Sequence, residues 1–258
     1  MSQKMKTSEL IPHKDNDFFF DDIAGEAWQE FIDSIKTSGV IEPIVVTQNK
    51  VIISGHQRVR ACKALGIDEI EAEVRIIDSE DEILKQLIET NIRQRGIGNT
   101  NPVKFGRCIK ELERIYGIQN GNNQHSDRDG NNFQPKTQED LASELGVDVR
   151  TLHNYKILSE MIPELQTLVE TGIVTPTTAR AIVKKLPEFQ QRELAKQFAE
   201  KGEKVTGKEV NEKIKKLYSE LEDAKEENKT LRDANKDLGE ERDYYQQMYE
   251  DEKEKEPV

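Results

Sequence analysis

The sequence predicts three consecutive structures: an α+β N-terminal domain, an all-α domain built on a helix-turn-helix, and a C-terminal parallel coiled coil. Short β-branched runs alternate with segments of helical periodicity from residue 1 to about residue 98, which indicates the α+β unit. Two short helical patterns flank a glycine turn between Thr137 and Leu158, the layout of a helix-turn-helix. A heptad pattern from residue 205 to about residue 250 indicates the coiled coil.

Composition excludes several broad classes of protein. The chain has 258 residues and a net charge of −12, and its hydrophobic share of 34% is low for one compact globule. It carries no apolar signal-type segment and no apolar run of about 18 residues, so we expect neither secretion nor membrane association. Cys62 and Cys108 lie at unrelated spacing, so we expect free thiols in a reducing cytoplasm, with no disulfide and no metal site.

The negative charge is concentrated at the C-terminal end of the chain. Residues 209–258 hold seventeen acidic and ten basic side chains, which contribute −7 of the net −12. The acidity of the whole chain therefore does not exclude a DNA-binding surface in the preceding residues.

The α+β domain is expected over residues 1–98. Apolar spacing predicts a helix over 24–38 and another that begins after an N-cap at Ser79. The aromatic cluster Phe18–Phe20 is expected in a loop that inserts its rings into another part of the molecule, which the sequence does not specify. The expected strands are 5–11, 44–46, 51–53 and 71–77, of which 44–46 and 51–53 should form a hairpin.

The stretch 51–66 predicts a strand, a tight turn at Ser54-Gly55 and a helix. Free backbone N–H groups at the start of a helix, together with the helix dipole, favour a bound anion. Arg58 and Arg60 lie within reach of that point, so the segment is typical of a phosphate-binding turn. A buried strand and helix with two solvated arginines would have the same local pattern, and the local pattern alone does not separate the two interpretations.

Residues 99–204 are expected to form the helical domain. An amphipathic helix is predicted over 99–117, and the stretch 119–136, rich in Asn, Gly, Gln and Asp, is expected to be a mobile surface loop. That loop could contact nucleic acid through His125 and Arg128, or it could simply be solvated.

Residues 137–158 predict the helix-turn-helix itself. Thr137 begins the first helix with a pattern like a capping box, Gly146 lies at the turn, and Asp148 opens the second helix. Polar side chains on its outer faces could contact base edges or phosphates in a major groove, although an ordinary αα-hairpin also has polar faces. The residues expected to bind DNA are Thr137, Gln138, Arg150, Thr151, His153, Asn154 and Lys156.

Apolar residues recur at alternating spacings of three and four over residues 205–250. Asparagine at the a positions Asn228 and Asn235 costs stability but favours a parallel two-stranded register. A single solvated, charged helix is the alternative. The residues expected at the dimer seam are Ile214, Leu217, Leu221, Asn228, Leu231, Asn235 and Leu238. We expect a disordered tail over 251–258.

Two segments give the chain a family resemblance. The run Gly-His-Gln-Arg-Val-Arg-Ala at 55–61 and the run Glu-Thr-Asn-Ile-Arg-Gln-Arg at 89–95, followed by the helix-turn-helix, resemble the ParB family of partition proteins. The resemblance covers roughly residues 5–200. It implies a sulfiredoxin-like N-terminal fold that binds a cytidine nucleotide, CTP with Mg²⁺. Carried over residue by residue, the nucleotide-binding positions are Ser54, Gly55, His56, Gln57, Arg58, Arg60, Glu89, Asn91, Arg93 and Arg95.

The chain departs from the family pattern at both boxes. His56-Gln57 stands where the family has Glu-Arg, and Thr90 separates Glu89 from Asn91. We therefore expect nucleotide binding, with at most weak CTP hydrolysis as a switch, no residue assigned as catalytic, and no metabolic activity.

The resemblance implies a sequence-specific DNA-binding protein of plasmid, phage or chromosome partition, cytoplasmic and associated with a nucleoid or plasmid. The expected partners are double-stranded DNA with a palindromic site, a second copy of the chain in a homodimer, and a partition ATPase. A transcriptional regulator of a mobile element, a ParB-fold nucleotide-dependent enzyme such as a kinase or nuclease, and a scaffold acting through its coil are the alternatives. Ser54 occupies the place where sulfiredoxin chemistry needs a cysteine, which argues against redox repair.

Overall fold

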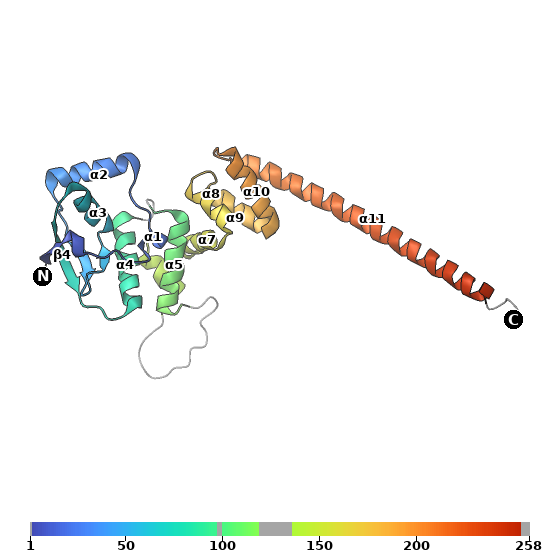
Figure 1. Cartoon of the computed structure of the whole chain (residues 1–258), viewed down its shortest axis with the longest axis horizontal. Coiled ribbons are helices and arrows are strands. Elements are labelled where there is room, and N and C mark those ends of the chain that lie inside the picture. Colours follow the sequence, from blue (N-terminus) through green and yellow to red (C-terminus); the bar gives the residue numbers. More distant parts are fainter. Residues whose placement is uncertain (1, 97–99, 119–135, 254–258) are drawn as a thin grey trace, which may run out of the picture.

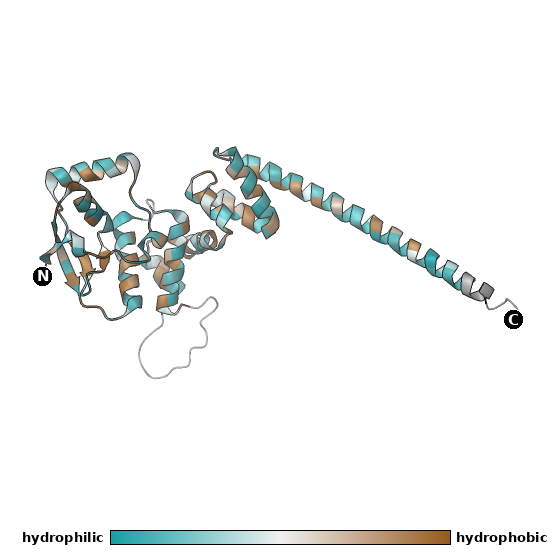
Figure 2. Ribbon diagram, in the orientation of Figure 1, coloured by the Kyte–Doolittle hydropathy of each residue, from teal (hydrophilic) through white to brown (hydrophobic). Residues whose placement is uncertain are grey.

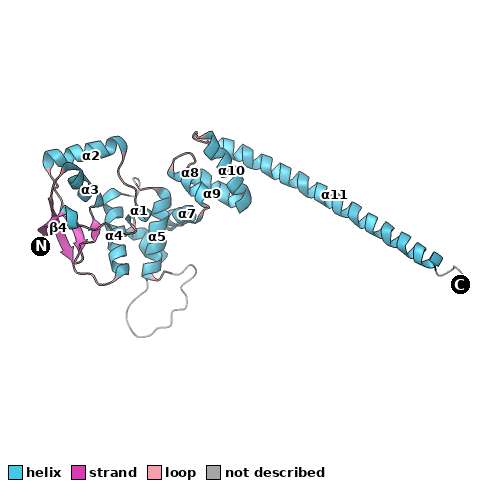
Figure 3. Cartoon of the chain, in the orientation of Figure 1, coloured by secondary structure: helices cyan, strands magenta, loops and turns pink. Residues whose placement is uncertain are grey.

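The computed structural model describes residues 2–96, 100–118 and 136–253. The molecule has a sheet-containing end, a helical middle and one long projecting helix (Figure 1). All strands lie at the N-terminal end (Figure 3), which agrees with the predicted order of an α+β unit followed by helices. Among the described residues, no helix is both long enough and apolar enough to span a bilayer.

A four-stranded sheet forms the base of the N-terminal end, in the order β1-β4-β2-β3. Its strands are β1 (Ser2–Lys6), β2 (Ile44–Thr47), β3 (Ile52–Ser54) and β4 (Glu69–Arg75). β2 and β3 pair antiparallel, which confirms the predicted hairpin, whereas β2 and β4 run parallel.

The first strand lies earlier than predicted. It ends at Lys6 and is followed by the short 3-10 helix η1 (Thr7–Glu9), so the expected strand over 5–11 is wrong. Lys4 stands opposite Glu71 and Lys6 opposite Glu69, and opposite charges facing each other across two strands stabilise that register. The partner of β1 is more than sixty residues away, so no local pattern identified it.

Four helices complete this end of the molecule: α1 (Asn16–Phe19), α2 (Gly25–Ser38), α3 (His56–Leu65) and α4 (Glu80–Arg95). α3 ends at Gly66, whose φ of 69° is the left-handed C-cap that the sequence predicts. Ser79 caps α4 by accepting the backbone N–H of Glu82. A small core between η1, the sheet and α3 contains Leu10, Ile44, Val46, Ile52, Val59, Cys62, Ile70 and Ala72.

The helical middle contains α5 (Pro102–Tyr116), α6 (Gln138–Glu144), α7 (Val149–Glu160), α8 (Pro163–Glu170), α9 (Pro176–Lys185) and α10 (Glu188–Lys201). Its first core joins α4, α5, α6 and α7, and Phe19 and Phe20 of the N-terminal end are buried in it. Two of the three rings of the aromatic cluster therefore insert into the helical middle, whereas Phe18 is 55% exposed. The core runs across the expected domain boundary at residue 98. The predicted mobile loop lies outside the described residues except for Lys136.

The last helix, α11 (Gly207–Lys253), begins inside a core and ends as a free rod (Figure 1). Val210 and Ile214 are buried against α8, α9 and α10, and Leu217 packs at the edge of the same core. Ile214 therefore lies in the core of its own chain and not at the expected dimer seam, and Leu217 is partly covered by the same core. Beyond them the helix is mostly hydrophilic (Figure 2), and it continues past the expected end of the coil to Lys253, so the start of the predicted tail is helical.

Candidate nucleotide and DNA sites

Gly55 creates the turn between β3 and α3. Its φ of 104° is a conformation that favours glycine, and a Cβ atom there would lie 2.4 Å from Cγ2 of Ile44. The chain therefore turns directly from a buried strand into a helix whose first N–H groups lack intrahelical partners. This is the strand, turn and helix that the sequence predicts, and it provides backbone donors for an anion.

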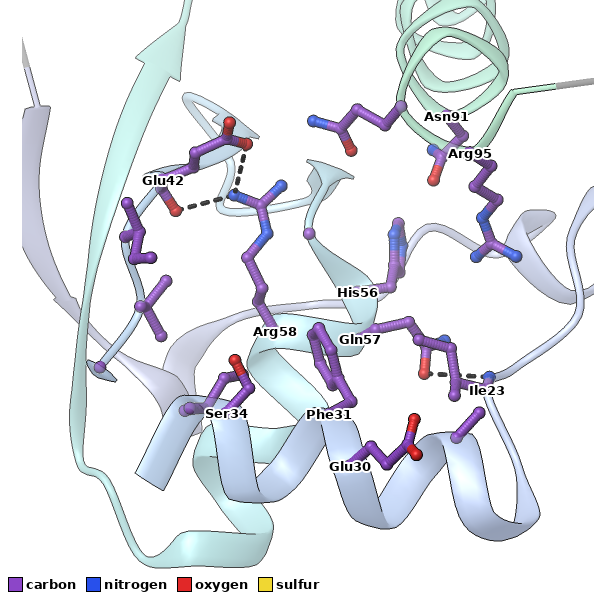
Figure 4. Close-up of a pocket in the computed structure, with 17 residues that line it drawn as sticks. Ile23, Glu30, Phe31, Ser34, Glu42, His56, Gln57, Arg58, Asn91 and Arg95 are labelled. Atoms are coloured by element: carbon purple, nitrogen blue, oxygen red, sulfur yellow. Dashed lines mark hydrogen bonds and ion pairs between the residues drawn. The ribbon is translucent and has the colours of Figure 1, made fainter. Parts of the chain in front are cut away.

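A cavity of about 1020 Å³ lies between this turn, α2 and α4 (Figure 4). Its polar lining includes Gly55, His56, Gln57, Arg58, Asn91, Gln94 and Arg95, together with Glu30, Ser34 and Glu42. Its opposite wall, from α2 and the segments at its two ends, includes the apolar side chains Ile23, Ala27, Phe31, Ile35, Val40 and Ile41. A cavity with one apolar wall and several convergent polar groups is typical of a small-molecule site.

Arg58 and Arg95 bring two guanidinium groups to this cavity. Arg58 donates to the carbonyl oxygens of Glu42 at 2.7 Å and Pro43 at 2.9 Å, and Arg95 donates to the carbonyl of Asp21 at 2.8 Å. Burial lowers the pKa of both guanidiniums because it removes water from the charged form. An anion in the cavity would offset that desolvation.

Two further predicted residues lie at or beside the cavity. Ser54 is buried below the turn, where its hydroxyl donates to Gln94 at 3.2 Å. Asn91 is buried, and its amide donates to the carbonyl of Leu87 at 2.8 Å, which fixes the side chain at the cavity wall. The structure therefore brings together the two boxes that lie more than thirty residues apart in the sequence.

Three predicted nucleotide residues, Arg60, Glu89 and Arg93, do not line this cavity. Arg60 lies over the ring of Trp28, 3.8 Å from its centroid, and donates to the carbonyl of Ile23. Glu89 accepts a hydrogen bond from the hydroxyl of Tyr116, and burial together with that bond raises the pKa of the tyrosine. Glu89 and Arg93 line a second, smaller cavity beside α5 and α6.

The helix-turn-helix consists of α6 and α7, joined at Gly146. Asp148 caps α7 by accepting the N–H of Thr151 at 2.8 Å, and the hydroxyl of Thr151 donates to the same carboxylate. Arg150 and His153 are exposed on α7, and Asn154 is partly exposed. Their polar groups are available for base edges or phosphates.

Two residues predicted to contact DNA instead anchor the motif to α5. Lys156 is only 5% exposed and forms an ion pair with Glu113 at 2.6 Å. Gln138 donates to the same glutamate at 3.1 Å. Lys156 is therefore not available to DNA in this structure, and Thr137 acts as the N-cap of α6 through a capping box with Asp140.

Sequence reasoning missed Glu113 and the cavity wall on α2. Glu113 lies between Leu112 and Arg114 in an amphipathic helix, where an acidic residue is normally solvated. Its burial, which only the fold shows, is what requires a partner for its carboxylate on another helix. Phe31 and Ile35 of α2 resembled ordinary core positions because the helical spacing of a cavity wall and of a core face is the same.

Two family models match the chain. The model described as the ParB N-terminal domain matches residues 2–91, and the model described as the ParB HTH domain matches residues 131–219. Together they cover more than half of the chain, and they divide it where the sheet-containing end and the helix-turn-helix lie.

Curated relatives carry the same family name. A probable chromosome-partitioning protein ParB of Vibrio cholerae is 27% identical over 208 residues, which are 79% of this chain and 62% of that protein. The one from Coxiella burnetii is 30% identical over 66% of this chain and 52% of its own length. A nucleoid occlusion protein of Halalkalibacterium halodurans is 25% identical over 90% of this chain and 74% of its own. The chain thus spans less than two thirds of the ParB relatives named here.

Solved structures are similar to a smaller extent. A C-terminally truncated chromosome-partitioning protein ParB from Caulobacter crescentus, complexed to the centromeric parS site, is 20% identical, with a TM-score of 0.48 over 83% of this chain and 99% of that chain. The same protein complexed with CTP-gamma-S gives a TM-score of 0.33 at 22% identity, over 77% of this chain and 99% of that chain. Similarities of this size do not assign a ligand to this chain.

Proposed function

The chain belongs to the ParB family, and from that premise we propose that it is a sequence-specific DNA-binding protein of a partition system, switched by a CTP-type nucleotide. One observation carries the proposal. A single chain combines an exposed polar face on α7 with a cavity at the N-terminus of α3 that suits an anion. The protein would act in the cytoplasm on a nucleoid or a plasmid.

The two walls of the cavity support a nucleotide in one orientation. The triphosphate would lie at the Gly55 end, where backbone donors, Arg58 and Arg95 converge. The base and sugar would then lie against Phe31 and the other apolar side chains of α2. The cytosine base itself rests on the family resemblance. Magnesium would enter bound to the phosphates, as it commonly does. Glu89, the carboxylate of the second box, contacts Tyr116 and would not hold the ion.

The DNA-binding assembly would be a homodimer. Past Leu217, α11 keeps the heptad spacing, and Leu231 and Leu238 are 56% and 62% exposed on the isolated helix. Apolar d positions with Asn228 and Asn235 at a would be covered by the same helix of a second copy. A two-fold dimer presents two α7 helices and therefore recognises a palindromic site. A partition ATPase is the partner that the family role implies.

The nucleotide site is tested with two basic residues of the same helix. Arg58→Ala should weaken CTP binding by about tenfold to a hundredfold, because a charge-assisted hydrogen bond contributes about 1.5–3 kcal/mol. Lys63→Ala is the control, since Lys63 is exposed on the same helix, does not line the cavity and should leave the affinity nearly unchanged. Isothermal titration calorimetry of the full chain gives both affinities. Equal affinity in wild type and Arg58→Ala would remove that residue from the site, and no CTP binding by the wild type would refute the nucleotide switch.

The DNA site is tested on sequences recovered by pull-down of sheared genomic DNA, with and without CTP. On the most enriched fragment, Arg150→Ala should lower affinity and reduce the slope of log affinity against log salt by about one if the residue contacts a phosphate. Lys36→Ala on α2 removes the same charge far from α7 and is the control. A few palindromic sites with CTP-dependent spreading would indicate partition. Enrichment of promoters alone would indicate a transcriptional regulator instead.

A further inference from the structure

Residues 13–23, here called the strap, connect the cavity to the helical middle. The strap leaves α3 at His13, passes α5 with the α1 helix, and returns to α3 at Asp22 and Ile23. Both of its ends are therefore held by the helix that begins at the cavity, and its centre is held by α5.

His56 and Gln57 hold the two ends. The backbone N–H of His13 donates to Nε2 of His56 at 3.2 Å. The side-chain amide of Gln57 donates to Asp22 at 2.5 Å, and its oxygen accepts the N–H of Ile23. Both side chains also line the cavity, so each contacts the ligand space and the strap. These two residues are the pair that departs from the family pattern.

The imidazole of His56 has two distinct sides. Because Nε2 accepts from His13, the proton of the neutral ring lies on Nδ1. Nδ1 is buried and has no hydrogen-bond partner among the described residues. A buried donor without a partner is costly, so any rearrangement that gives Nδ1 an acceptor would stabilise the ring.

The centre of the strap is embedded in the helical middle. Phe19 and Phe20 are buried in the core formed by α4, α5, α6 and α7. Lys104 of α5 donates to the carbonyls of Asp17 and Phe20, and Arg107 donates to the carbonyl of Phe18. The strap cannot shift without disturbing α5.

α5 in turn lies directly on the helix that presents the DNA-binding side chains. A Cβ atom at Gly106 would meet the carbonyl oxygen of Tyr155 at 2.1 Å, so α5 and α7 touch backbone to backbone. The ring of Phe105 packs edge-on against Tyr155 at 4.7 Å between centroids. A displacement of α5 therefore reaches α7 without a flexible intermediate.

We propose that His56 and Gln57 are positioning residues that link occupancy of the cavity to the strap, and through the strap to α5 and α7. The inference rests on the proposed function, because it names how the nucleotide site would act on the DNA site. A ligand that engages the cavity wall favours one arrangement of the two anchors. By linkage, the factor by which the ligand shifts the equilibrium between strap arrangements is also the factor by which the strap arrangement changes the ligand affinity.

The experiment removes an anchor that lies outside the cavity. Asp22→Ala takes away the acceptor of the Gln57 amide, and Asp22 is not part of the cavity wall. Asp22 also lies 3.5 Å from Arg60, so Asp22→Asn is added, which loses the charge but keeps an acceptor for Gln57. Lys14→Ala is the control within the strap, because it removes only an exposed ion pair with Glu80. Thermal melts of each variant without ligand establish that the chain is folded.

Amide hydrogen exchange of the full chain is then measured with and without CTP, alongside CTP affinity by calorimetry. In the wild type, Lys14→Ala and Asp22→Asn, CTP should change exchange in the strap, α5 and α7. In Asp22→Ala, CTP should still bind, while the change in α5 and α7 falls by more than about half. If CTP binds the wild type without changing hydrogen exchange in the strap, the inference alone is overturned. The same holds if CTP changes exchange in α5 and α7 of Asp22→Ala as much as in the wild type. A wild-type chain that binds no CTP overturns the proposed function and the inference with it.

Discussion

His56 is kept neutral by its surroundings. Burial, with His13 as the next cause, lowers its pKa from 6.5 to about 4. The folded ring therefore has a lower proton affinity than the ring in the unfolded chain, and between these two values the unfolded state binds the additional proton. Stability contributed by the neutral ring is present above about pH 6.5 and is lost as the pH falls toward 4.

This sign gives a prediction for His56→Gln. The substitution should flatten the dependence of unfolding free energy on pH between about 6.5 and 4, where the wild type should lose up to about 3 kcal/mol through this residue. Urea unfolding at a series of pH values measures the difference between the two proteins. His153→Gln, at an exposed site on α7, is the control. A pH dependence that is unchanged in His56→Gln would contradict the assignment.

Charged residues that are close together on one helix lie in different environments. Arg58 lines the cavity, whereas Arg60 of the same helix lies over the ring of Trp28. Lys156 follows buried Leu152 by four residues and therefore shares its face. For Lys156 the helical angle, which is read from the sequence, carried more information than the residue type.

At the scale of elements, the crossing of α5 and α7 positions the helix-turn-helix. Gly106 permits the close approach to Tyr155, and Lys156 of α7 is neutralised by Glu113 of α5 in a buried pair. Removing one partner of such a pair leaves an uncompensated buried charge, so this contact favours one arrangement of the two helices strongly. α7 is thus oriented by α5 as well as by its turn with α6.

Gly106→Ala tests the crossing. The new methyl group would meet a backbone carbonyl, which cannot rotate away, so the helices must separate. We expect a loss of about 1–3 kcal/mol of stability from overpacking, although alanine favours a helix by up to about 1 kcal/mol over glycine. Denaturant unfolding measures the net change. Gly239→Ala in α11, where nothing lies within 4 Å, is the matched control and should cost no stability; equal stability of both variants would show that the crossing has room.

In the molecule as a whole, α11 is partly a core helix and partly a solvent-exposed rod. Its first turns bury Val210 and Ile214 in the helical core, and only the part beyond Leu217 is free to meet a second chain. In the proposed dimer, this helix would fix the orientation of the core relative to the coiled coil. Most acidic residues of α11 lie in the rod, and only Glu209 and Glu212 precede Leu217.

Two truncations separate these roles. A chain ending at Glu220 should keep the unfolding midpoint of the helical domain but sediment as a monomer at concentrations where the full chain is a dimer. A chain ending at Lys208 should in addition lose about 1.5–3 kcal/mol for each of Val210 and Ile214. Sedimentation velocity and thermal melts distinguish the two effects. A dimer that persists in the chain ending at Glu220 would place the main contact outside the rod.

The sequence alone determined the features that depend on neighbours within about one helical turn. The caps at Ser79 and Asp148 and the left-handed glycines Gly55 and Gly66 all follow from bonds over short separations. The family resemblance added the pairing of the two boxes, of which Gly55, His56, Gln57, Arg58, Asn91 and Arg95 line one cavity.

Only the tertiary structure decided which of these side chains meet across long separations. Lys156 contacts Glu113 across a sequence separation of 43 residues, and Gln57 contacts Asp22 across 35. The thiol of Cys108 approaches the carbonyl of Phe19 across 89 residues. Such contacts form because buried polar groups need partners and apolar faces need cover, and many segments of the chain could satisfy either need. The packing of the whole chain selects among these segments. The anchors of the strap and the buried start of α11 therefore depend on the tertiary structure and not on local sequence.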